Sequence, residues 1–92
     1  MSNRIYKVQI TGRVQGVSFR FWTREEAVRL GLGGWVRNEP DGSVTALISG
    51  PDGAVSMMLE RFWQGPAGAV VADVRAQAAD GAAVPTGFSI TG

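Results

Sequence analysis

Apolar and polar residues alternate along several stretches of this chain, as they do in strands with one buried face. The clearest run spans residues 5–11, where Tyr6, Val8 and Ile10 share one face. Shorter apolar or alternating runs predict further strands over residues 33–38, 43–50, 70–78 and 88–91. A Pro-Asp-Gly turn separates the second strand from the third, so we expect these two to form a hairpin.

Two other segments carry apolar residues at helical spacing. The first, residues 21–30, ends at a glycine, and we expect Phe21, Ala27 and Val28 to face the core. The second begins near Asp52, a residue suited to the N-cap, and stops at the sequence Gln-Gly-Pro. The apolar stripe of this second helix consists of Val55, Met58, Leu59, Phe62 and Trp63.

The order of these elements is β-α-β-β-α-β with a final short strand. It predicts an α+β sandwich of the ferredoxin-like class, with both helices on one face of a mostly antiparallel sheet. The first and second strands should run parallel with the third between them, so their carboxyl ends reach the same edge. This places Asn38 near the segment that follows the first strand. We expect residues 1–92 to form one domain.

Composition narrows the chemistry that such a domain can perform. The 92 residues are 45% hydrophobic, contain no cysteine and no histidine, and carry a net charge of +1. This composition excludes disulfides, thiolate nucleophiles, imidazole bases and the usual zinc ligands. The small net charge gives no general field for nucleic acid or an anionic membrane, so any anion site must be local. No apolar leader or membrane-spanning stretch is present, so we expect a cytoplasmic protein.

One short segment, "GRVQGVSFR" at residues 12–20, has the features of an anion site. It joins a strand to a helix N-terminus, where backbone N–H groups and the helix dipole favour a negative ligand. Gly12 and Gly16 allow backbone conformations closed to other residues and a close approach to a ligand. Arg20 could bind two oxygens of a phosphate or carboxylate at once.

Each feature also has an ordinary structural explanation. A Gly-x-x-x-Gly spacing is common in loops, and Arg20 could be a surface residue. Asn38, just before a turn, could serve only to shape the backbone. The residues alone leave these alternatives open.

The same residues resemble a known family. The run "GRVQGVSFR" is similar to the first signature of the acylphosphatases, and "GWVRNEPDGSVTALISG", residues 34–50, is similar to their second. "GLGGW" and the "GP" after the second helix also fit the family pattern, so the resemblance covers nearly the whole chain. It implies a ferredoxin-like fold and an enzyme that hydrolyses acyl phosphates.

The resemblance implies a role for each matching residue. Arg20 and Asn38 would be the catalytic pair, and Gly12 and Gly16 would shape the loop. Asn38 would hold the attacking water, and the bound phosphate itself could accept the proton. We expect no metal and no cofactor, a small acyl phosphate as substrate, inorganic phosphate as product and inhibitor, and a monomer without nucleic-acid or membrane partners. The phosphate-binding residues would be Gln15, Gly16, Val17, Ser18, Phe19 and Arg20.

The chain departs from the family pattern at Thr45, where an acidic or amide residue is frequent, and in the alanine-rich segment 72–83. These departures bear on stability and substrate preference more than on the reaction. Rival functions for this element order fit less well. An RNA-binding domain needs stacking aromatics on its central strands, and a heavy-metal carrier needs a cysteine pair. A non-catalytic anion-binding or regulatory module of the same fold remains the alternative.

Overall fold

A computed structural model describes residues 3–92 and contains two helices and five strands. The helices are α1 (Phe19–Arg29) and α2 (Asp52–Gln64). The strands are β1 (Asn3–Arg13), β2 (Gly33–Asn38), β3 (Val44–Pro51), β4 (Val70–Ala78) and β5 (Phe88–Ile90). Every strand and helix expected from the sequence is therefore present. Within residues 3–92, no helix has the length and apolar character needed to cross a membrane.

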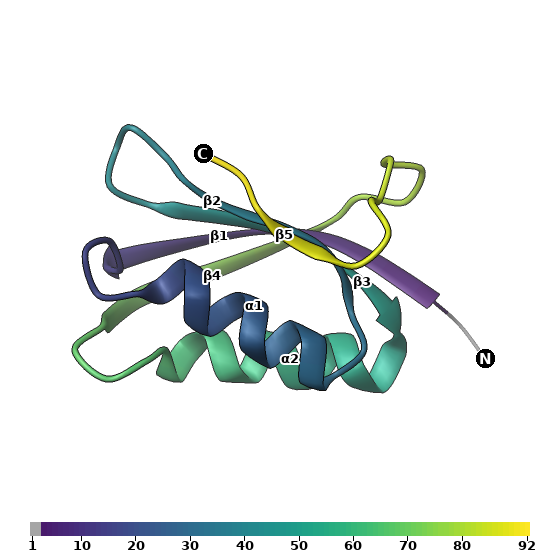
Figure 1. Ribbon diagram of the computed structural model, residues 1–92, viewed down its shortest axis with the longest axis horizontal. Helices are drawn as coiled ribbons and strands as arrows, with labels where there is room; N and C mark the ends of the chain where they lie inside the picture. Colours follow the sequence, from purple (N-terminus) through teal and green to yellow (C-terminus); the bar gives the residue numbers. More distant parts are fainter. Residues whose placement is uncertain (1–2) are drawn as a thin grey trace.

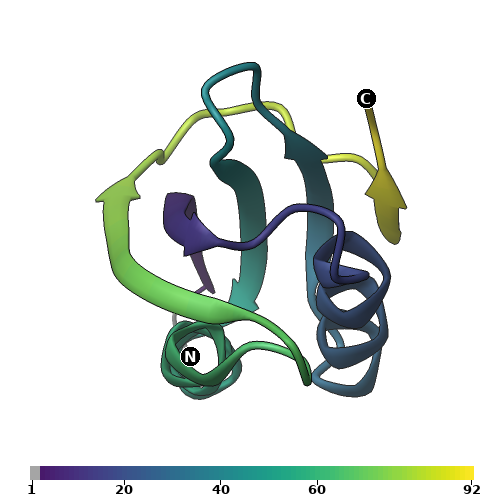
Figure 2. The ribbon, with the colours of Figure 1, turned by 90° about the vertical axis from the view of Figure 1, so that its left-hand side faces the viewer.

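The strands form one sheet in the order β4-β1-β3-β2-β5, in which β5 runs parallel to β2 and the other neighbours are antiparallel. Both helices lie side by side on one face of this sheet (Figures 1 and 2). This is the ferredoxin-like sandwich predicted from the sequence, and the fold prediction is confirmed. Because β3 lies between β1 and β2, the carboxyl ends of β1 and β2 emerge at the same end of the molecule, the left-hand end of Figure 1.

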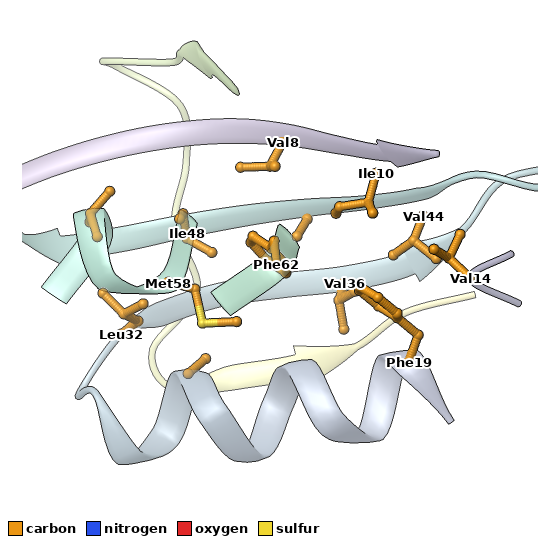
Figure 3. Close-up of a cluster of buried hydrophobic side chains, with 13 residues drawn as sticks. Val8, Ile10, Val14, Phe19, Leu32, Val36, Val44, Ile48, Met58 and Phe62 are labelled. Atoms are coloured by element: carbon orange, nitrogen blue, oxygen red, sulfur yellow. The ribbon is translucent and has the colours of Figure 1, made fainter. Parts of the chain in front are cut away.

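A single hydrophobic core fills the space between the sheet and the helices (Figure 3). The strands contribute the alternating positions of β1, β2 and β3, and α2 contributes Val55, Met58 and Phe62. Phe19 stacks on Phe62 with ring centroids 6.3 Å apart, and Trp22 packs against both rings. These aromatic contacts join the start of α1 to the end of α2, so they fix the helix end nearest the β1–α1 loop.

The buried face of α1 differs from the one that we expected. Phe21 and Val28 are 58% and 62% exposed, so their inward placement was wrong. The helix begins earlier than its apolar pattern suggests, and its buried residues Phe19, Thr23 and Ala27 recur every four positions. In α2, Asp52 is the first helical residue and Pro51 occupies the N-cap, while Trp63 is half exposed.

A β-bulge interrupts the pairing of β1 with β4. Thr11 pairs with Asp73 but Gly12 pairs with Val71, so Ala72 is the extra residue. The bulge breaks the alternation of faces along β4, so Val71 and Val74 both pack against the core although they are three positions apart. A Cβ atom on Gly12 would lie 2.2 Å from the carbonyl oxygen of Val70. Gly12 therefore allows β4 to approach β1 closely just before the loop begins.

Candidate active site

The loop of residues 14–18 connects the end of β1 to the start of α1. Val14, at its start, and Phe19, which follows it, are buried, so the core holds both of its ends. Gly16 has φ 74° and Ser18 has φ 62°, whereas the φ of Val17 between them is not positive. Left-handed residues in a short loop can turn backbone N–H groups toward one side, as in anion-binding nests.

The start of α1 leaves its backbone donors available. No side chain caps the helix at Ser18, and its first turn contains no acidic residue. The first N–H groups of a helix have no partner within the helix and carry partial positive charge. Ser18 adopts its left-handed conformation without the freedom of a glycine, at a cost of about 1 kcal/mol. Strain of this kind is found mainly at functional sites.

A cavity of about 280 Å³ opens beside this loop. It brings Arg20, from the first turn of α1, together with Asn38, the last residue of β2. The sheet order explains the meeting, because β1 and β2 end at the same edge on either side of β3. The residues that line the cavity are Val14, Gly16, Ser18, Phe19, Arg20, Phe21 and Asn38.

The guanidinium of Arg20 is held in place by a backbone group. Its Nη1 atom donates a hydrogen bond to the carbonyl oxygen of Gly92 at 2.9 Å. A guanidinium has five N–H donors in one plane, so this bond leaves others for an anion in the cavity. The side chain is therefore anchored and keeps further N–H groups that can bind an anion.

The turn between β2 and β3 is cross-linked to the loop by Gln15. The Nε2 atom of Gln15 donates to the carbonyl oxygens of Glu39 and Ser43, at 2.8 Å and 2.9 Å. From the sequence, Gln15 is predicted only as one of the phosphate-binding loop residues, and no pattern in the chain indicates where its side chain lies. A single amide side chain among the small or apolar residues of the loop is the one sequence signal that could have suggested such a role.

Two carboxylates of the turn are held in their charged form. Hydrogen bonds from Thr45 and then Arg37 lower the pKa of Glu39. The hydroxyl and backbone N–H of Ser43 lower the pKa of Asp41. Thr45, a departure from the family pattern, thus has a partner in the turn. Both carboxylates are ionised at neutral pH and are weak bases, so neither is suited to accept a proton from water there.

A larger concavity, of about 710 Å³, lies on the uncovered face of the sheet. It is lined mainly by side chains of β1 and β4, such as Lys7, Arg75 and Gln77, and includes neither Arg20 nor Asn38. Of these two cavities, only the smaller one adjoins a helix N-terminus and contains Arg20 together with Asn38, so we assign the candidate chemistry there. Residues 3–92 contain no group of three or more acidic residues placed to hold a metal ion.

Comparison with known proteins shows which family the chain belongs to. The sequence profile of the acylphosphatases matches residues 6–90. The chain belongs to the acylphosphatase family. It is 73% identical over 84 residues to the acylphosphatase of Rhizobium meliloti (strain 1021), which covers 91% of this chain and 88% of that protein. It is 58% identical over 90 residues to the acylphosphatase of Rhizobium etli, covering 98% and 96% of the two chains.

The fold of this acylphosphatase-family chain agrees with that of a solved relative. The crystal structure of the Bacillus subtilis acylphosphatase superposes with a TM-score of 0.92 at 33% identity, covering 98% of this chain and 99% of the other. The family predicted from the two sequence motifs is therefore confirmed, together with its enzyme class of hydrolases that act on acyl phosphates. The roles of individual residues in the cavity remain predictions.

Proposed function

We propose that this protein hydrolyses the carboxyl–phosphate bond of small acyl phosphates, giving a carboxylate and inorganic phosphate. The observation that carries the proposal is the single cavity in which Arg20, Asn38 and the β1–α1 loop meet, in a chain of the acylphosphatase family. A phosphoryl group needs several donors aimed at its oxygens, and the loop amides and Arg20 beside this cavity would supply them.

In the proposed complex, the phosphoryl oxygens accept hydrogen bonds from the loop amides of residues 15–19. The left-handed conformations of Gly16 and Ser18 and the uncapped start of α1 support this role. Arg20 donates two further N–H groups to the same oxygens and places its positive charge beside them. Because charge on these oxygens is present before the reaction and redistributes during it, Arg20 contributes to both binding and rate.

Asn38 would hold the attacking water. Its side-chain amide can accept a hydrogen bond from water and donate another to the phosphoryl group, which keeps the water in line with the bond that breaks. Water oxygen bonds to phosphorus while the phosphorus–oxygen bond to the acyl group breaks. The carboxylate leaves with that electron pair, and the water proton passes to a phosphoryl oxygen.

No strong protein base is required by this scheme. The leaving carboxylate has a conjugate acid with a pKa of about 4, so it departs as a stable anion without protonation. The lowered pKa values of Glu39 and Asp41 make the turn carboxylates poor bases. We therefore expect kcat to vary little around neutral pH, without a bell-shaped profile.

The proposal includes a cytoplasmic monomer that needs neither a metal nor another cofactor. Activity should survive an excess of chelator, and sedimentation equilibrium should give the chain mass of 9.8 kDa. Loss of activity on chelation, restored by a divalent cation, would contradict the cofactor part. A dimer mass would contradict the monomer part alone.

The experiment that tests the function is hydrolysis of benzoyl phosphate by the purified protein, followed by its ultraviolet absorbance. We expect Arg20→Ala to lose about 1000-fold or more in kcat/KM, and Asn38→Ala to lose about 100-fold, mainly in kcat. Arg29→Ala is the matched control, because Arg29 lies on the same helix but its side chain is 69% exposed.

The possible outcomes separate the two candidate functions. Rapid turnover by the parent protein, lost in both folded site variants and kept in the control, supports the enzyme. Inorganic phosphate should inhibit competitively. A folded parent protein that binds phosphate without turnover would contradict hydrolysis and leave the anion-binding module.

A further inference from the structure

The side chain of Gln15 is the direct polar link between the β1–α1 loop and the β2–β3 turn. Its Nε2 atom lies 2.8 Å from the carbonyl oxygen of Glu39 and 2.9 Å from that of Ser43. These acceptors are separated from Gln15 by 24 and 28 positions in the chain. The bonds are partly shielded from water, which makes them stronger than contacts on an open surface.

The two carbonyl groups form the neck of the turn. The N–H of Glu39 donates to the carbonyl oxygen of Ser43 at 2.8 Å, and the N–H of Gly42 donates to that of Glu39 at 3.2 Å. Gln15 adds one further bond to each of these oxygens and so uses both N–H groups of its amide. An apolar side chain of the same length could make neither bond, and a carboxylate would face both carbonyl oxygens without a hydrogen to donate.

Asn38 comes immediately before Glu39, so the bond to the Glu39 carbonyl fixes the backbone next to Asn38. We propose that Gln15 is a positioning residue, whose side-chain amide sets the placement of Asn38 relative to the phosphate-binding loop. This inference rests on the proposed function, in which Asn38 holds the attacking water. Gln15 itself then acts on the reaction through Asn38 and not through its side chain touching the substrate.

The positioning role of Gln15 affects the rate of hydrolysis more than it affects phosphate binding. The loop amides and Arg20 bind the phosphoryl group, and the loop keeps its two buried anchors, Val14 and Phe19, when the Gln15 amide is lost. The water must lie in line with the breaking bond, and a misplacement of about 1 Å costs up to about 100-fold in rate. Loss of the Gln15 amide should therefore lower kcat and leave phosphate affinity nearly unchanged.

The test uses Gln15→Leu and Gln15→Met, which both remove the side-chain amide without adding a charge beside the phosphate-binding loop. The matched controls are Gln77→Leu and Gln77→Met, because Gln77 is exposed on β4 outside the cavity. For the folded Gln15 variants we expect kcat for benzoyl phosphate to fall between about 10-fold and 100-fold. The inhibition constant of inorganic phosphate should stay within about twofold, and both control variants should match the parent protein.

A double-mutant cycle decides whether Gln15 acts through Asn38. In the Asn38→Ala background, Gln15→Leu should cause little further loss of kcat, because the group that it positions is gone. Two results overturn the inference: full kcat in a folded Gln15 variant, or effects of the two substitutions that multiply. A parallel loss of phosphate affinity would also overturn it, by showing that Gln15 shapes the cradle instead. Absence of turnover in the parent protein would instead contradict the proposed function.

Discussion

Gly12 and Gly16 both have positive φ angles, yet the structure gives them different tasks, and substitution by alanine should separate these. At Gly12, φ is 121°, and an added Cβ would lie 2.2 Å from the Val70 carbonyl oxygen and 2.7 Å from the Ala72 nitrogen. At Gly16, φ is 74° and an added Cβ would meet nothing within 4 Å. Only the first substitution forces two strands apart.

The magnitudes follow from these contacts. Gly16→Ala should cost about 1 kcal/mol of the free energy of unfolding, the price of one left-handed alanine. Gly12→Ala adds a less favourable φ angle, about 1–3 kcal/mol, and the displacement of β4, which weakens one or two ladder hydrogen bonds of about 1 kcal/mol each. The total is about 2–5 kcal/mol. A domain of this length has a free energy of unfolding of only about 5–14 kcal/mol.

Thermal unfolding followed by tryptophan fluorescence measures both variants, since the chain contains three tryptophans. Gly16→Ala should lower the melting temperature by about 4–8 °C and Gly12→Ala by more, at least about 8 °C. Equal losses for the two variants would refute the reasoning, because it would mean that the close approach of β4 to Gly12 adds nothing to the effect of the positive φ angle.

Two further predictions concern charges away from the cavity. The lowered pKa values of Glu39 and Asp41 stabilise the fold fully above their ordinary values of about 4, and this stability is lost as pH falls through the lower folded-state values. The urea concentration at the unfolding midpoint should therefore decrease as the pH is lowered below about 4, and it should decrease less steeply in Glu39→Gln. A midpoint concentration that rises on acidification would contradict the assignment. Arg61 joins α2 to Glu26 of α1 at 2.9 Å with both side chains mostly shielded, so Arg61→Met should lower the free energy of unfolding, measured with urea, by about 1 kcal/mol. Arg29 also pairs with Glu26 but is exposed, so Arg29→Met should lower it by less than about 0.5 kcal/mol. Equal losses in the two variants would contradict this distinction.

The period-2 and helical patterns were sufficient to predict the fold, because they depend mainly on which residues face the core. The β4 strand was predicted with its observed bounds despite its alanines. The face of α1 was predicted correctly only at Ala27, since Thr23 is buried and Phe21 is exposed, the reverse of their ordinary preferences. The reversal depends on the residue at which the loop ends and the helix begins, and no local sequence pattern specifies that residue.

The meeting of Arg20 and Asn38 in one cavity follows from strand order, so the sequence could predict it. The bond from Arg20 to Gly92 and the bonds from Gln15 to the turn could not be predicted in the same way. Each joins a side chain to a backbone carbonyl far along the chain. Every residue has a backbone carbonyl, so a hydrogen bond to one places no requirement on the residue type and leaves no pattern in the sequence.

The central claim is that water attacks phosphorus in the cavity of Arg20 and Asn38. Hydrolysis of benzoyl phosphate by the parent protein in oxygen-18 water, with the products analysed by mass spectrometry, tests this claim most directly. We predict that the label enters inorganic phosphate and that benzoate stays unlabelled. Label in benzoate would show attack at the carbonyl carbon and would contradict the role assigned to the phosphate-binding loop.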